Sequence, residues 1–309
     1  MLAIKRHVTP LIAALAMLLP VAGYTVPRVA ATINPVYFLV SAVVHGVTEP
    51  VLPATGASCV HDCVLKPSDV AKLNSSDIVF YTDDRLESFV SRLGHKAGRR
   101  LVRLSDEVEL LAERGIKGRY THEKDLHIWL NPDNASKMLR KICTALSEED
   151  PENAPVYKRN AEVALARIQD MISEIGAALA PVKDVPYMAE HDAYQYFDRY
   201  FGLNFVAALS GSGGHASGIT ARRLAFAKRA VKLHNVRCIF ADSQHGASRY
   251  RLVGKKKTYT LDPLGRDIGP GKDGYFKMMR AIADGFRDCL QQGIDQSSQE
   301  YRPFPQKGV

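Results

Sequence analysis

One long helical stretch, residues 156–179, contains no proline and separates two parts of the chain that share a different pattern. Apolar residues recur along it at the three- and four-residue spacing of one helix face: Ala161, Val163, Ala164, Ile168, Met171, Ile172 and Ile175. A helix of this length reaches roughly 36 Å at 1.5 Å per residue. It can therefore connect two separate folding units.

Short strand-like segments alternate with amphipathic helices on both sides of this stretch. Such alternation is typical of α/β units built on parallel sheets. Before the long helix, strands are predicted over 28–36, 76–82 and 99–105, and helices over 37–47, 66–74 and 131–148. After it, strands are predicted over 185–190, 204–209, 237–243 and 257–265, and helices up to 201 and over 221–233 and 275–292. The fold class is α/β, with two lobes of mostly parallel sheet joined by one long helix.

The pattern also gives the domain boundaries. We expect a signal peptide at 1–23, a first α/β lobe at 24–150, a linking helix at 151–180, a second α/β lobe at 181–291 and a tail at 292–309. The tail is polar and contains prolines, so it is expected to be disordered.

The N-terminus has the organisation of a secretory signal peptide. Lys5 and Arg6 precede an apolar run, residues 11–23, which is too short to span a bilayer and ends in small residues. No later segment is apolar enough to cross a membrane, and no cysteine lies near the cleavage region. The mature protein is therefore expected to be exported, soluble and without a lipid anchor.

The net charge of +8 does not indicate a nucleic-acid protein. The densest basic runs, residues 98–100 and 255–257, are short, isolated and lack interleaved aromatic residues. We interpret them as solvated loops.

Five cysteines fit an oxidising compartment. Cys238 lies in a strand-like run and Cys289 in the terminal helix, and we expect a disulfide between them. Cys59 and Cys63 are close enough to pair across a turn, which leaves Cys143 over.

Three of the ten histidines share one context. His61, His127 and His191 each follow an extended or loop segment and come just before a helix start. In α/β lobes this is the sheet edge where ligands bind. Neutral imidazoles bind zinc and other late first-row metals, and three of them with a carboxylate or water form a tetrahedral site. For any single histidine, an ordinary buried role is the competing interpretation.

Four segments carry a family resemblance: "TGASCVHDCVLKPSDVAKLNSSDIVFY", "DLHIWLNPDNA", "HDAYQYFDRYFGL" and "TLDPLG". In order and spacing they resemble the zinc receptors of ABC importers, of the ZnuA type within the TroA-like metal-receptor family. The resemblance implies a metal bound between the lobes by His61, His127 and His191. It also implies Asp262 or a water as fourth ligand, and the Cys238–Cys289 bridge. Manganese receptors of the family usually have Glu at the position of His191, so this histidine favours zinc.

The sequence departs from the family before the second ligand. Zinc receptors often carry a long His- and acid-rich loop there, whereas this chain has only "GRYTHEKDLH". His122 and Glu123, with Asp125, are candidates for a remnant secondary metal site. His215 lies where relatives have a Pro-rich run, and we expect it to be a loop residue.

The function predicted from these features is a periplasmic receptor that binds Zn²⁺ and delivers it to an ABC permease in the inner membrane. We expect a monomer, no nucleic-acid partner and no enzymatic activity. Two alternatives stay open, a manganese or iron receptor of the same family and a secreted zinc hydrolase. The chain lacks the H-E-x-x-H motif of many zinc hydrolases.

Overall fold

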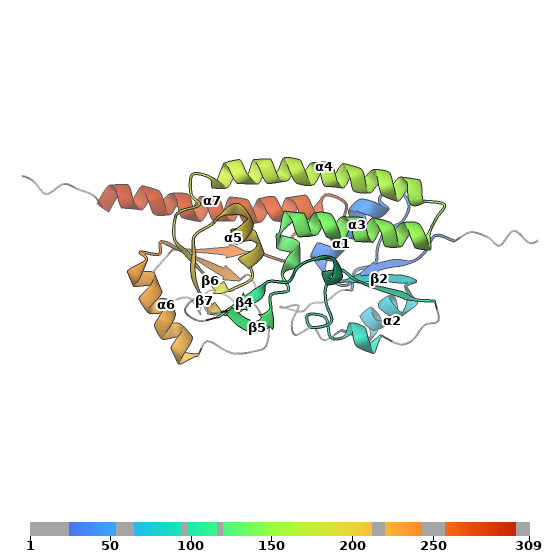
Figure 1. The fold of residues 1–309 in the computed structure, drawn as a ribbon, viewed down its shortest axis with the longest axis horizontal. Helices are drawn as coiled ribbons and strands as arrows, with labels where there is room; N and C mark the ends of the chain where they lie inside the picture. Colours follow the sequence, from blue (N-terminus) through green and yellow to red (C-terminus); the bar gives the residue numbers. More distant parts are fainter. Residues whose placement is uncertain are drawn as a thin grey trace, which may run out of the picture.

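The structure, a computed structural model, describes residues 25–53, 65–93, 98–115, 120–211, 220–242 and 257–300. Two sheets lie side by side, and the long helix α4 runs over both (Figure 1). Each sheet is parallel, as the α/β alternation predicts.

The first lobe holds a sheet of order β1-β2-β3 and a separate antiparallel hairpin, β4–β5. Its strands are β1 (Val29–Ala31), β2 (Ile78–Tyr81), β3 (Arg100–Arg103), β4 (Ala112–Arg114) and β5 (Tyr120–Lys124). Its helices are α1 (Asn34–Val44), α2 (Pro67–Ser75), α3 (Pro132–Glu149) and the short 3-10 helices η2 (Val90–Arg92), η3 (Ser105–Glu107) and η5 (Ile128–Leu130). The Asn131 side chain accepts hydrogen bonds from Asp133 N and Asn134 N, so Asn131 caps the start of α3.

The second lobe holds a sheet of order β7-β6-β8-β9. Its strands are β6 (Tyr187–His191), β7 (Phe205–Ser210), β8 (Cys238–Asp242) and β9 (Lys257–Leu261). Its helices are α5 (Gln195–Phe201), α6 (Ala221–Leu233) and α7 (Gly274–Glu300).

The strand order creates a crevice at β6. After β6 the chain adds β7 on one side, then crosses to add β8 on the other. At such a switch point the loops leaving the carboxyl ends of neighbouring strands diverge, and ligands bind between them. His191 is the last residue of β6, so the fold places it at this crevice.

The linking helix is α4 (Ala154–Leu179). Its buried residues recur every three or four positions: Tyr157, Ala161, Ala164, Ile168, Met171, Ile175 and Leu179. Val163, predicted on this face, is instead 55% exposed. Helix α4 packs against α1 and α3 of the first lobe and α7 of the second.

The two lobes share a large hydrophobic core, and each lobe also has a smaller buried cluster of its own. A single cluster of buried residues includes Phe38 of α1 and Tyr275 of α7. Gly274 lets the two helices approach closely, because a Cβ atom there would lie 2.1 Å from the Phe38 ring. Wide opening of the lobes would have to expose this shared core.

Two sequence predictions need correction. The first strand ends at Ala31 and α1 begins at Asn34, because Pro35 suits the first helical turn and cannot donate to a strand ladder. Helix α7 continues to Glu300, so the prediction of a disordered tail from residue 292 is wrong as far as residue 300. Residues 1–24, which contain the predicted signal peptide, and 301–309 lie outside the described residues.

The predicted disulfide between Cys238 and Cys289 is present and ties β8 to α7. It joins residues 51 apart in sequence, a loop whose closure stabilises a fold by ~4 kcal/mol in the chain-entropy model. Cys143 is half-buried and unbridged, and Cys59 and Cys63 lie outside the described residues. No helix in the described part of the chain is long and apolar enough to cross a membrane.

Glu87 is a fully buried acid at the carboxyl edge of the first sheet. It accepts hydrogen bonds from Thr82 N at 2.6 Å and Asp83 N at 3.2 Å, and it pairs with the Thr32 hydroxyl. Burial raises the pKa of Glu87 from its ordinary value of 4.5 to about 7. The folded chain therefore holds a proton that the unfolded chain has already lost over this pH range.

The expected result is that Glu87→Gln is more stable than the wild type at pH 8 but not at pH 4. Because burial raises the pKa of this acid, the stability of the wild type falls as pH rises from about 4.5 to 7, and a neutral amide avoids this loss of about 3 kcal/mol. Urea denaturation at both pH values measures this difference. An equal effect of the substitution at the two pH values would contradict a raised pKa of Glu87.

Candidate metal site

His127 and His191 come together between the lobes. Their ring centroids lie 5.2 Å apart at an interplanar angle of 70°. His127 precedes η5 in the first lobe, and His191 ends β6 in the second. Only 2% of His127 and 8% of His191 is exposed. His61, the third predicted ligand, lies outside the described residues.

Asp125 orients the His127 ring. Its Oδ1 atom lies 2.8 Å from His127 Nδ1 and accepts the His127 backbone N–H at 3.0 Å. With Nδ1–H donating to Asp125, Nε2 is the nitrogen through which His127 would bind a metal. Asp125 is fully buried, and burial raises its pKa to about 7. Sequence reasoning grouped Asp125 with the secondary site, whereas the structure makes it the partner of His127.

We expect Asp125→Ala to weaken zinc binding about 10- to 100-fold, the usual effect of losing the carboxylate behind a ligating histidine. Asp125→Asn keeps an oxygen that can accept from the His127 backbone N–H and from its Nδ1–H, and it loses only the negative charge. Its zinc affinity should therefore fall less than that of Asp125→Ala. Competition with a chromogenic chelator measures both affinities. Unchanged zinc affinity in Asp125→Ala would contradict the role given to this carboxylate.

Trp129 packs edge-on against His127, with ring centroids 5.3 Å apart. It is fully buried, and its Nε1–H donates to Pro263 O of the second lobe at 2.8 Å. Tyr275 of α7 donates its hydroxyl to Trp129 O at 2.9 Å. The segment carrying His127 is thus fastened to the second lobe, and Trp129 fluorescence should respond to a metal at His127.

Arg114 of β4 is the main ionic contact between the lobes. Its Nε atom donates to Asp192 Oδ2 at 2.9 Å, Nη2 donates to Asp192 Oδ1, and Nη1 donates to Asp198 Oδ2 at 2.8 Å. The guanidinium also lies 3.5 Å from the centroid of the Phe205 ring. Asp192 directly follows His191, so a first-lobe residue holds the end of the second-lobe strand that carries this histidine.

Tyr196 of α5 makes a contact in the other direction, from the second lobe to the first. Its hydroxyl accepts the Leu111 N–H at 2.9 Å and donates to Asp125 O at 3.1 Å. The second lobe therefore holds the segment that orients His127, while the first lobe holds the neighbour of His191. This crossed arrangement fixes the two histidines relative to each other.

These interlobe contacts were not evident from the sequence. Asp192 lies just before α5 but does not cap it, because α5 begins at Gln195 and has no side-chain cap. Asp192 instead pairs with Arg114. Sequence reasoning missed Arg114 and Tyr196, because nothing in the local pattern indicates that a hairpin of one lobe reaches the other.

Asp262 shapes the loop after β9. Its Oδ1 accepts Leu264 N–H at 3.1 Å and its Oδ2 accepts Arg266 N–H at 2.5 Å, around Gly265 in the left-handed region at φ 63°. Within the described ranges, no three His, Cys, Asp or Glu side chains form a group that could hold a metal. The role of Asp262 as fourth ligand thus stays a prediction.

His122 and Glu123 are exposed neighbours on β5. Successive side chains of a strand point to opposite faces, which disfavours chelation of one ion by both. Their role as a secondary metal site stays a prediction.

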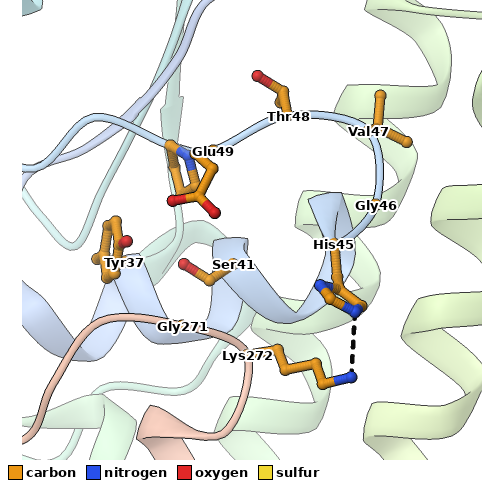
Figure 2. A pocket seen from close by; sticks show the side chains of 10 residues that line it. Tyr37, Ser41, His45, Gly46, Val47, Thr48, Glu49, Gly271 and Lys272 are labelled. Atoms are coloured by element: carbon orange, nitrogen blue, oxygen red, sulfur yellow. Dashed lines mark hydrogen bonds between the residues drawn. The ribbon is translucent and has the colours of Figure 1, made fainter.

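A surface pocket of about 350 Å³ lies at the far end of α1 (Figure 2). Lys272 Nζ lies 3.1 Å from His45 Nε2 at its rim. His45 is the exposed C-cap residue of α1 and lies at the end opposite the carboxyl edge of β1. The pocket is therefore separate from the crevice at β6.

Comparison with known families decides the assignment. The model of the periplasmic zinc-uptake complex component A, ZnuA, matches residues 29–289. The chain belongs to the ZnuA family. The high-affinity zinc uptake system protein ZnuA of Brucella abortus is 30% identical over 308 residues, covering 85% of this chain and 91% of that protein. Its Haemophilus ducreyi counterpart is 31% identical over 290 residues, covering 84% and 92%.

Solved structures confirm the predicted fold class of this ZnuA-family chain. The laminin-binding adhesin Lmb of Streptococcus agalactiae superposes with a TM-score of 0.74 at 21% identity, over 85% of this chain and 99% of the other. FpvC of Pseudomonas aeruginosa, in complex with Mn²⁺, gives 0.74 at 22% identity, over 87% and 99%.

Proposed function

We propose that this protein is a periplasmic receptor that captures Zn²⁺ and delivers it to an ABC-type permease in the inner membrane. The observation that carries the proposal is the meeting of His127 and His191 from opposite lobes at the switch point of a parallel sheet. ZnuA-family relatives named for high-affinity zinc uptake support the same cargo.

The proposed ligands are His61, His127 and His191, with Asp262 or a water as the fourth. Zinc prefers tetrahedral sites with nitrogen ligands, whereas manganese prefers oxygen ligands and higher coordination. Burial of His127 and His191 keeps the site away from bulk water, which strengthens the metal–ligand interaction. Protonated imidazoles cannot bind zinc, so affinity should fall as pH drops through the histidine range.

Release would follow a small rearrangement rather than a wide hinge motion. The shared core and the Arg114 contact resist separation of the lobes. A docked permease would have to displace the crossed contacts around the histidines to free the metal. The proposed receptor is a monomer and catalyses no reaction.

A manganese receptor is the second candidate, because a protein of the same fold binds Mn²⁺. Equilibrium dialysis of the mature chain against equal zinc, manganese and iron(II) separates the candidates. The proposal expects one tightly bound zinc ion per chain that the other metals do not displace. Preferential binding of manganese or iron would reject the zinc assignment.

A further inference from the structure

The positive charge of the chain is concentrated in one segment. Residues 220–257 contain 11 of the 41 lysines and arginines but only one of the 33 acidic residues. The rest of the chain therefore carries 30 basic and 32 acidic residues and is close to neutral. This imbalance gives the second lobe a charge that the first lobe lacks.

Within this segment, helix α6 presents a continuous basic face. Arg222, Lys228, Arg229 and Lys232 are all exposed. At 100° per residue these four side chains fall within an arc of about 120° and extend about 15 Å along the axis. The helix contains no acidic residue. These four exposed cations form a stripe along the helix, which we call the α6 basic face.

The α6 basic face differs from several other exposed basic residues of the protein, which form ion pairs. Arg100, Arg103 and Arg280 each pair with a carboxylate at 2.6–2.8 Å. No such ion pair involves the four cations of the α6 basic face among the described residues.

Part of the charge pattern works against the helix itself, although Lys232 in the last turn suits the helix dipole. Lys228 and Lys232 are four positions apart, where like charges repel. Arg222 lies in the first turn, where the helix dipole favours acidic side chains, and the turn has none. Local conflicts of this kind gather at functional sites, so this surface is a candidate for binding.

The position of α6 leaves this face open to a large partner. One side of α6 packs on the sheet, in a cluster that contains Met188 of β6 and the helix residues Ala227, Ala230 and Val231. The neighbouring strand residue, Tyr187, belongs to the core on the other face of the sheet, beneath α4 and α7. Helix α6 therefore covers the sheet face away from α4, as Figure 1 shows. Apart from Leu233 at its C-terminal end, which is 70% exposed, the large apolar residues of α6 face the sheet, so α6 would contact a bilayer mainly through its charges.

We propose that the α6 basic face binds the anionic phospholipid surface of the membrane. Four cations on one helix face, with no acidic residue among them, suit a diffuse negative surface. A specific protein partner is less favoured, because protein interfaces are depleted in lysine and combine both signs of charge. Such contact would concentrate the protein at the membrane. The inference goes beyond the proposed zinc function and does not depend on bound metal.

The test is co-sedimentation of the mature, disulfide-intact chain with phosphatidylcholine vesicles, with and without phosphatidylglycerol. We expect binding only to the phosphatidylglycerol vesicles, and a decrease as salt rises. Neutralising the face with Arg222→Gln, Lys228→Gln, Arg229→Gln and Lys232→Gln should weaken binding at least tenfold.

The matched control removes two lysines and two arginines from α3 and α4, on the opposite side of the protein: Lys137→Gln, Arg140→Gln, Lys158→Gln and Arg159→Gln, all exposed. It lowers the net charge equally and should bind vesicles like the wild type.

Circular dichroism and zinc binding check that both variants are folded. The proposal would be overturned if the two variants lost vesicle binding equally, or if the α6 variant bound as well as the wild type. It would also be overturned if the wild type did not bind vesicles that contain phosphatidylglycerol. The last result would point to an acidic protein partner instead.

Discussion

Replacing His191 by alanine is expected to weaken zinc binding by more than about 100-fold, beyond the 10- to 100-fold that follows loss of a residue supporting a ligand. The substitution removes one of the three proposed imidazoles and leaves the ion with His61, His127 and the fourth ligand, Asp262 or a water. His127→Ala should have a similar effect, because its ring faces His191 at 5.2 Å between centroids. Chelator competition measures both affinities.

His234→Ala is the matched control for these variants. His234 is the exposed C-cap residue of α6, outside the crevice at β6. It should bind zinc like the wild type, and its denaturation should be unchanged. If His191→Ala folds normally and still binds zinc with wild-type affinity, His191 is not a ligand.

Replacing Arg114 by methionine is expected to destabilise the protein by about 3–5 kcal/mol at pH 8, because it leaves buried charge uncompensated. Asp192 and Asp198 are both nearly fully buried, and Arg114 pairs with both. Burial raises the pKa of Asp198 to about 7 even with Arg114 present, and loss of Arg114 would raise it further. At pH 5.5 Asp198 can take up a proton, so the variant should lose less stability there.

Two comparisons separate the loss of this buried pair from a general loss of charge. Arg280→Met breaks an exposed pair with Glu174, which should contribute less than about 1 kcal/mol. Adding Asp192→Asn and Asp198→Asn to Arg114→Met removes the stranded charges and should restore part of the stability. Urea denaturation at pH 5.5 and 8 measures all four proteins. A loss in Arg114→Met no greater than in Arg280→Met would contradict the interlobe role of Arg114.

The fold follows closely from local sequence patterns. The apolar spacing and lack of proline in 156–179 predict α4, and Asn131 followed by Pro132 predicts the start of α3. These signals are local and agree with the tertiary packing, so propensity and burial give the same result. The hairpin β4–β5 was not predicted, because its strands have only three and five residues and carry several charges.

The candidate site was only partly predictable. His127 and His191 stand out because each ends an extended segment before a helix, a position that a single chain reveals. Their supporting residues do not, since Arg114 and Tyr196 act on segments 78 and 71 residues away in sequence. Contacts of this kind depend on how two lobes meet, and no local pattern encodes that geometry.

Zinc K-edge X-ray absorption of the zinc-loaded mature chain tests the central claim most directly. The proposal predicts a four-coordinate ion with the multiple-scattering signature of histidine imidazoles at about 2.0 Å, reduced by one imidazole in His191→Ala. A spectrum without imidazole ligands, or one that His191→Ala leaves unchanged, would contradict a zinc site built from both lobes.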